Sequence, residues 1–166
     1  PEATEVLVEL LSHENANIRR YAVSSLGKIG NPETRDEVVA LLEDESAGVR
    51  RQAVSALVEF EDPRVTKHLV ADLKDPSAGV RQAALEGLKR LKVKGTVRAL
   101  IAALRDRENR NRRLAVEALG ELQDPRAVPA LLTMLQDEDE SVRAAAEDAL
   151  EQMEQLTPLE WERRWE

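Results

Sequence analysis

The residue types that most often catalyse reactions or bind metals are sparse in this chain of 166 residues. Histidine occurs only at His13 and His68, and cysteine is absent, which excludes thiol catalysis, disulfides and thiolate metal sites. The sequence contains no Ser/His/Asp grouping, no glycine-rich phosphate loop and no carboxylates at metal-ligand spacing. We therefore expect neither an enzyme nor a bound cofactor or metal.

One segment concentrates positive charge on an otherwise acidic chain. Residues 105–113 read RDRENRNRR, whereas the whole chain has a net charge of −8. Exposed arginines could bind an anion or an acidic partner, and the candidates are Arg105, Arg107 and Arg110. The alternative, which we prefer, is a solvated turn.

The acidic balance also limits the partners. Nucleic-acid backbones attract basic proteins, so a net charge of −8 argues against general nucleic-acid binding. No segment approaches the roughly 20 apolar residues that a membrane-spanning helix needs, and no signal-like start is present. We expect a cytoplasmic monomer without membrane contact.

A repeat of 31 residues determines where all of these residues lie. Four positions hold the same residue type in all five copies, which is the signature of a tandem-repeat solenoid. We expect a single domain, 1–166, with repeats 1–31, 32–62, 63–93, 94–124 and 125–155 and a tail, 156–166. The invariant residues are Leu11, Leu42, Leu73, Leu104 and Leu135; Arg19, Arg50, Arg81, Arg112 and Arg143; Ala22, Ala53, Ala84, Ala115 and Ala146; and Leu26, Leu57, Leu88, Leu119 and Leu150.

Each repeat carries two apolar patterns with helical spacing. Asn31, Asp62 and Asp124 are good N-caps, and each precedes a proline. Each repeat is therefore predicted to be a helical hairpin, with helices at about positions 1–12 and 16–29. The invariant alanines let neighbouring helices approach closely. The second helices are predicted to be capped by Asn15, Ser46, Ser77 and Asp139.

The predicted fold is all-α, a right-handed αα superhelix (α-solenoid) of five 31-residue helical hairpins plus a C-terminal capping helix. The cap is the tail, in which Trp161 and Trp165 share one face of a short helix. These tryptophans would cover the exposed apolar end of the last repeat. The second helices would line the inner, concave face.

An aspartate followed six residues later by an arginine recurs in four repeats, beside sequences such as VRRQA at 49–53 and DPRAV at 124–128. This pattern resembles the HEAT family, and particularly the short phycobilisome-lyase HEAT-like repeats, over residues 1–155. The resemblance implies a hydrogen-bonded ladder in which turn aspartates and arginines join adjacent repeats. The pairs are Asp44 with Arg50, Asp75 with Arg81, Asp106 with Arg112, and Asp137 with Arg143.

Some di-iron hydroxylases with HEAT repeats carry His-Glu pairs, which makes His13-Glu14 a candidate. Those pairs lie on the second helix and recur in several repeats, whereas this one occurs once, in a turn. We interpret His13 as a solvated turn residue that stands where other repeats have aspartate. His68 is predicted to be an exposed residue of a first helix.

Side chains of the second helices that point away from the apolar stripe should project onto the concave face. They vary between repeats, as solenoids require of a surface that binds a large partner. The leading hypothesis is a non-catalytic interaction module or scaffold for a protein or peptide. The predicted binding residues are Arg20, Tyr21, Ser24, Arg51, Gln52, Ser55, Gln82, Glu86, Arg113 and Glu117.

Two other hypotheses stay open. The resemblance implies a possible bilin lyase or isomerase subunit that acts on phycobiliproteins. The chain also opens on Pro1, at the same repeat position as Pro32, without an initiator methionine. We therefore keep the alternative of an engineered or excised repeat array without a native task.

Overall fold

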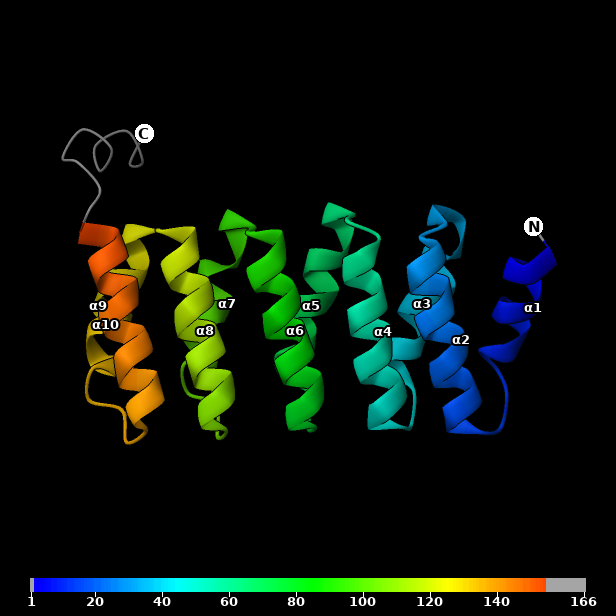
Figure 1. Ribbon diagram of the computed structural model, residues 1–166, viewed down its shortest axis with the longest axis horizontal. Coiled ribbons are helices and arrows are strands. Elements are labelled where there is room, and N and C mark those ends of the chain that lie inside the picture. Colours follow the sequence, from blue (N-terminus) through cyan, green and yellow to red (C-terminus); the bar gives the residue numbers. More distant parts are fainter. Residues whose placement is uncertain (1, 155–166) are drawn as a thin grey trace. The chain divides into compact units, whose positions relative to one another are not determined.

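The computed structural model describes residues 2–154, which form α-helices and short 3₁₀-helices with no strand among them (Figure 1). The all-α repeat architecture predicted from the sequence is confirmed. The predicted capping helix and its tryptophans lie outside the described residues, and the handedness of the superhelix stays a prediction. The α-helices are α1 (Glu2–Leu10), α2 (Ala16–Ile29), α3 (Arg35–Ala40), α4 (Ala47–Glu59), α5 (Thr66–Asp72), α6 (Ala78–Leu91), α7 (Val97–Ala103), α8 (Asn109–Leu122), α9 (Val128–Met134) and α10 (Glu140–Glu154).

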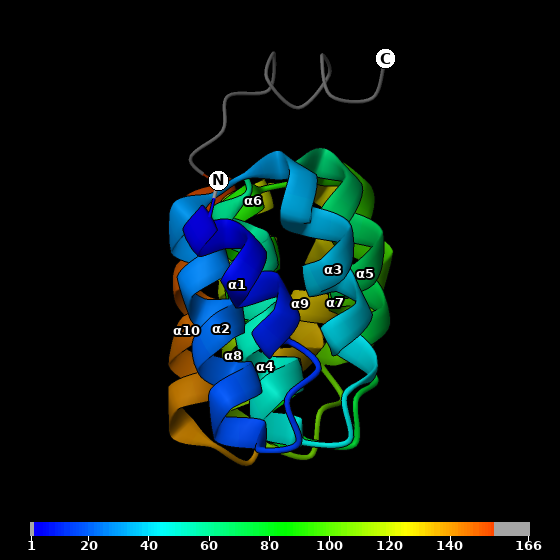
Figure 2. The same ribbon diagram turned by 90° about the vertical axis from the view of Figure 1, so that its right-hand side faces the viewer.

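The chain divides into two compact units, Pro1–Gly87 and Leu88–Glu166, here called the N-terminal and C-terminal units. The sequence predicts a single domain. The first helices of successive repeats form one layer, with α3 and α5 side by side in Figure 2, and α2 and α4 form the other layer. Within the C-terminal unit, α7 and α9 form one layer and α8 and α10 form the other. No helix within residues 2–154 is long and apolar enough to cross a bilayer.

The predicted caps of the first helices are confirmed, but the turn that follows each cap is tighter than an α-helix. Asn31, Asp62 and Asp124 accept hydrogen bonds from the backbone N–H two residues ahead, at 3.1, 2.9 and 3.0 Å. The next bonds run from residue i+3 to residue i, so the chain enters each first helix through a 3₁₀ turn. These turns are η1 (Pro32–Thr34), η3 (Pro63–Val65) and η5 (Pro125–Ala127), with η4 (Lys94–Thr96) lacking a side-chain cap and η2 (Leu41–Glu43) closing the first helix of repeat two.

The second helices are capped in two ways. Asn15 and Asp139 accept from the N–H groups of Asn17 and Ser141, at 2.8 and 2.9 Å, as predicted. The prediction for Ser46 is wrong, because its side chain makes no capping bond. Its backbone N–H instead donates to Oδ1 of Asp44 at 2.8 Å, so the aspartate two residues earlier organises the turn.

The invariant alanines are fully buried, and they lie where second helices of successive repeats pack, α2 on α4 and α8 on α10. The approach is very close at two glycines that share a repeat position. A Cβ on Gly27 would lie 2.7 Å from the Cβ of Ala56, and a Cβ on Gly120 would lie 2.8 Å from that of Ala149. No real Cβ pair is that close, so glycine is required there. We call these glycine–alanine contacts the seam.

A similarly close contact occurs between Gly87 and Val58, where the glycine belongs to the later of the two repeats and not to the earlier one. A Cβ on Gly87 would lie 2.6 Å from Cγ2 of Val58, which occupies the repeat position of Gly27. Gly87 itself occupies the repeat position of Ala56. The two sides of the seam are thus complementary in size, because the larger side chain moves from one helix to the other while the spacing stays short.

Candidate functional site

The turn between the two helices of a repeat is built around an arginine that reaches the next repeat. Arg19 of α2 donates to both carboxylate oxygens of Asp44, with Nε–Oδ2 at 2.7 Å and Nη2–Oδ1 at 2.9 Å. Its Nη1 donates to two carbonyl oxygens of its own turn. Arg50 of α4 repeats this geometry on Asp75, at 2.8 and 3.1 Å.

The C-terminal unit carries the same ladder. Arg112 of α8 donates to both carboxylate oxygens of Asp137 at 2.8 and 2.9 Å, and the two side chains are only 9% and 5% exposed. Arg143 of α10 donates through Nη1 to the carbonyl oxygens of Asp137 and Glu138. Within residues 2–154 it has no carboxylate partner. A hydrogen-bonded ladder between adjacent repeats, as the resemblance implied, is therefore confirmed inside each unit. Within a unit the predicted pairs differ in one respect, because the carboxylate binds the arginine of the preceding repeat, and the arginine six residues after it binds only the backbone carbonyl of that aspartate.

The ladder keeps its aspartates ionised. Burial disfavours the charged form of Asp44, but hydrogen bonds from Arg19 and from the Ser46 N–H outweigh burial and lower its pKa. The hydrogen bond from Arg112 likewise lowers the pKa of Asp137. Bidentate pairs of this kind fix the register of neighbouring repeats, so we assign the ladder no ligand.

His13 has a structural role in the first turn, as the sequence predicted. Its Nδ1 accepts the backbone N–H of Asn15 at 3.0 Å, which is the bond that Oδ1 of Asp44 accepts in the second repeat. The imidazole therefore replaces the aspartate as a turn acceptor. Among the residues that the structure describes, no group of three or more His, Asp or Glu side chains is placed to hold a metal ion.

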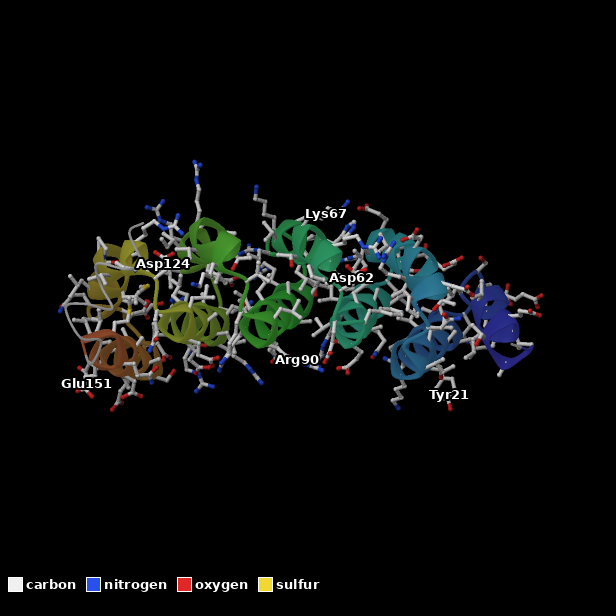
Figure 3. All side chains as sticks on the ribbon, turned by 90° about the horizontal axis from the view of Figure 1, so that it is seen from above. Tyr21, Asp62, Lys67, Arg90, Asp124 and Glu151 are labelled. Atoms are coloured by element: carbon white, nitrogen blue, oxygen red, sulfur yellow. The ribbon has the colours of Figure 1, made fainter. Side chains whose placement is uncertain are left out.

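The ten predicted binding residues all lie on second helices, α2, α4, α6 and α8, and none of them is buried. Tyr21 is the most notable, because 73% of its surface is exposed. Figure 3 shows it on the side of the N-terminal unit opposite Lys67. Their placement is that of a solvent-facing surface, and their role in binding stays a prediction.

These residues differ in how far their own side chains are engaged. Gln82 donates to Glu86 at 2.7 Å, and Arg113 pairs with Glu117 at 3.2 Å. The side chains of five others have no hydrogen bond or ion pair within residues 2–154, and these are Arg20, Tyr21, Ser24, Arg51 and Gln52.

The two unpaired arginines share one arrangement. Nη1 of Arg20 lies 3.9 Å from where a Cβ of Gly48 would be, and Cδ of Arg51 lies 3.7 Å from the same point on Gly79. Each arginine therefore extends across the first turn of the next second helix. Its guanidinium keeps its hydrogen-bond donors available to a partner.

The arginines of the predicted anion patch are exposed but do not form one pocket. Arg107 lines a shallow hollow, whose other walls include Glu138 and Asp139. Arg105 and Arg110 do not line it. Acidic walls oppose an anion, which favours the solvated-turn interpretation of this segment.

A more enclosed pocket lies between the first helices of repeats two and three, where the sequence predicted no site. It has a volume of about 230 Å³ and is lined by Arg35 and Val39 of α3, Arg64 of η3, and Lys67 and His68 of α5, among others. Sequence analysis missed it because its walls combine different positions of two consecutive repeats. The available signal was a run of basic residues at 64, 67 and 68 on an acidic chain.

His68 differs from its prediction. It is half-buried in this pocket and not exposed. Burial lowers its pKa, and the positive charges of Lys67 and Arg35 lower it further, against the opposing effect of Asp36. The local field around the imidazole is therefore positive.

The profile of HEAT repeats matches residues 4–77 and 66–151. A search of curated proteins found no match. Among solved structures, the chain is similar to the complex of CpcE and CpcF of phycocyanin lyase from Nostoc sp. PCC7120, with a TM-score of 0.78 and 27% identity over 96% of this chain and 68% of that one.

Two further structures resemble it in fold. The E. coli protein YibA gives a TM-score of 0.77 at 24% identity, over 90% of this chain and 59% of that chain. A designed armadillo repeat protein in complex with the peptide (KR)4 gives a TM-score of 0.68 at 21% identity, over 92% of this chain and 82% of that chain.

Proposed function

This chain belongs to the HEAT-repeat family, and from that premise we propose that it is a non-catalytic interaction module that holds a protein or peptide on its second helices. The observation that carries the proposal is on α2 and α4. Tyr21, 73% exposed, lies next in sequence to Arg20, and neither this arginine nor Arg51 has a side-chain partner within residues 2–154.

Such residues are the ones that dominate binding energy at protein interfaces. Tyrosine and arginine supply large contact areas and several hydrogen-bond donors at a modest entropy cost. The ring of an exposed tyrosine is apolar surface in contact with water. A partner that covers Tyr21 would bury this surface, with a favourable free energy of about 25 cal/mol per Å². The designed armadillo repeat protein of similar fold is in complex with the peptide (KR)4, so a solenoid of this kind can hold a peptide.

The test compares two variants, each with three alanine substitutions. The first replaces Arg20, Tyr21 and Arg51 by alanine. The control replaces Val6, Glu37 and Arg98, which are exposed on the first helices α1, α3 and α7. Because none of these six side chains is buried, both variants should keep the helical circular dichroism of the parent.

Tagged forms of the parent and both variants are used to capture proteins from a lysate, and any protein recovered is purified and titrated against all three. The proposal expects one partner whose affinity falls by roughly a hundredfold in the first variant and stays unchanged in the control. Equal affinity for the parent and the first variant would place the interface elsewhere. Capture of nothing specific would favour an array without a native task.

A second candidate function rests on one observation, the 27% identity with the CpcE–CpcF complex of phycocyanin lyase over 96% of this chain. On this alternative the chain is a subunit of a bilin lyase or isomerase that acts on phycobiliproteins. The purified chain would then bind a free bilin and change its visible absorption spectrum. An unchanged spectrum, with the bilin passing freely through a desalting column, would reject the alternative.

A further inference from the structure

The first-helix side of the N-terminal unit contains two pockets at equivalent repeat positions, and they carry opposite charge. The basic pocket, already described, lies between α3 and α5. The acidic pocket lies one repeat earlier, between α1 and η1, and its lining includes Glu5, Glu33 and Glu37. Repeat by repeat, Arg64 replaces Glu33 and His68 replaces Glu37.

In the basic pocket, ion pairs account for two of the three cations. Arg35 donates through Nη1 to Asp62 at 2.7 Å and through Nη2 to Asp36 at 2.6 Å. Arg64 pairs through Nη2 with the same oxygen of Asp62, Oδ2, at 2.6 Å. Two carboxylates thus balance two arginines, and the ammonium of Lys67 has no partner within the described residues.

The pocket therefore has a surplus of positive charge in a chain whose net charge is −8. The arginines cannot move freely to dissipate that charge, because Arg35 is fixed by two carboxylates and Arg64 by one. Cations that are already held in place around a cavity attract a bound anion, and no free energy is lost in ordering their side chains on binding.

The floor of the pocket is apolar. Val65 is almost fully buried and Val39 is half-buried, and both line the cavity beneath the charged groups. A volume of about 230 Å³ exceeds that of a simple inorganic anion and leaves room for a small apolar body. Charge at the rim and an apolar floor together suit a group with an anionic head.

We propose that this pocket binds a small oxyanion, either a carboxylate or a phosphate group, with Arg64, Lys67 and His68 around it. The site is independent of the second-helix surface proposed for a protein partner, since it lies on the opposite side of the N-terminal unit from Tyr21. The acidic pocket one repeat earlier would repel the same group. The array therefore discriminates by charge between two otherwise equivalent positions.

The experiment titrates the whole chain with sodium benzoate and, in a separate arm, with inorganic phosphate, at about 0.01 M ionic strength, where screening is weak. Nuclear magnetic resonance follows the imidazole protons of His68, with His13 as the internal control. A bound anion lowers the energy of the imidazolium, so the pKa of His68 should rise, while the imidazole protons of His13 should show no saturable response. Benzoate binding alone would assign the site to carboxylates with an apolar body, and tighter phosphate binding would assign it to phosphate.

Two variants test which side chains hold the anion. Lys67→Gln removes an exposed cation without a partner, so it leaves folding unchanged, and Arg64→Gln removes a wall of the pocket. The matched control is Arg126→Gln, because Arg126 occupies the repeat position of Arg64 and pairs with Asp124 at 2.6 Å, as Arg64 does with Asp62. Its neighbours at the positions of Lys67 and His68 are Pro129 and Ala130.

We expect Lys67→Gln and Arg64→Gln each to weaken binding by roughly tenfold, and Arg126→Gln to leave it unchanged. An equal loss in all three variants would mean diffuse attraction to surface charge and would overturn the proposal. So would the absence of a saturable His68 shift with either anion. Neither result depends on whether a protein partner binds the second helices.

Discussion

Two regions of the 31-residue repeat differ in how much they vary. The contacts between second helices are kept from repeat to repeat, whereas the pockets between first helices change their charge. Along the seam and the ladder, the partners keep their geometry from repeat to repeat. Arg19 and Arg112 hold Asp44 and Asp137 at almost the same distances, and Gly27 and Gly120 approach Ala56 and Ala149 equally closely. The first-helix pockets keep their place but change from glutamates to basic residues.

This difference shows which positions the fold constrains. A side chain at the seam meets the facing helix, so its size must complement that of the residue opposite it. A side chain at the rim of a first-helix pocket meets solvent, so its charge is free to vary between repeats. Function is therefore expected at positions whose residue type differs between repeats while the geometry stays the same. Substitutions in the seam or the ladder should lower stability, whereas substitutions in the pockets should change binding.

The largest effect is expected from the ladder. Arg112→Met leaves the carboxylate of Asp137, 5% exposed, without its bidentate partner, whereas Arg143→Met removes only bonds to two backbone carbonyls. Leaving a buried charge unpaired is costly, and with solvent nearby we expect Arg112→Met to lower the free energy of unfolding by about 2–3 kcal/mol.

For Arg143→Met we expect about 1 kcal/mol. Urea unfolding followed by circular dichroism measures both values. Equal losses would mean that the carbonyl bonds, and not the ion pair to the next repeat, provide the stabilisation.

The seam gives the next largest effect. Gly120→Ala places a Cβ 2.8 Å from that of Ala149, so α8 and α10 must move apart, and we expect a loss of about 1–2 kcal/mol despite the better helix propensity of alanine. Ala149→Gly alone should cost about 1 kcal/mol, as glycine in a helix interior does.

The double variant places the small residue on the other helix, as Gly87 does opposite Val58. The two changes should therefore compensate, with a favourable coupling energy of about 1 kcal/mol in a double-mutant cycle of urea unfolding. Strictly additive losses would show that the close approach does not depend on size complementarity.

A third effect distinguishes two aspartates of the first-helix layer. Hydrogen bonds from Arg64 and Arg35 lower the pKa of Asp62 well below the usual range. Burial instead raises the pKa of Asp72 to about 6. The negative charges of Asp75 and Glu43 raise it as well, and the positive charge of Arg50 opposes them. Oδ2 of Asp72 is buried and has no hydrogen-bond partner in the described chain.

Because the folded-state pKa of Asp72 exceeds its unfolded value, the ionised carboxylate destabilises the fold. This penalty is complete above pH 6 and disappears as the pH falls from about 6 towards 3.8. Asp72→Asn should therefore stabilise the chain by about 1 kcal/mol at pH 7.5, a figure reduced for partial exposure, and by much less at pH 4.5. A gain that is independent of pH, measured by urea unfolding at both values, would exclude ionisation of Asp72 as its cause.

The features that the sequence predicted are those carried by short segments or by the strict period. Asn31 and Asp62 stand directly before prolines, so local chemistry alone indicated the helix starts. The ladder followed from a family resemblance. The 3₁₀ turn after each cap was missed because its i+3 bonds differ from an α-helix only in geometry.

The seam and the basic pocket could not be predicted, because each depends on which residues meet across repeats. Gly27 and Gly120 share a repeat position, but only the structure shows that they face Ala56 and Ala149. His68 was expected to be exposed because its own helix leaves it open, and Arg35 of the preceding repeat supplies the opposite wall. Such neighbours are separated by about one repeat in the sequence and have no local signal.

The smallest effect on stability, and the strictest test of the comparison, comes from converting the acidic pocket into the basic one. Thr4→Arg, Glu33→Arg and Glu37→His place the residue types of Arg35, Arg64 and His68 at the equivalent positions one repeat earlier. All three side chains line an open surface pocket and none is buried. The free energy of unfolding should therefore change by less than about 0.5 kcal/mol.

The converted pocket should gain a saturable response to benzoate, which the new histidine at position 37 reports through a rise in its pKa. The gain follows if repeat geometry provides the cavity and charge alone decides its ligand. The converted pocket has the neutral Asn31 where the basic pocket has Asp62, but it has the carboxylate of Asp36 where the basic pocket has Lys67, so it should bind more weakly than the original. If benzoate binds only the original pocket, the cavity between α3 and α5 must supply something besides charge, and the two positions are not equivalent.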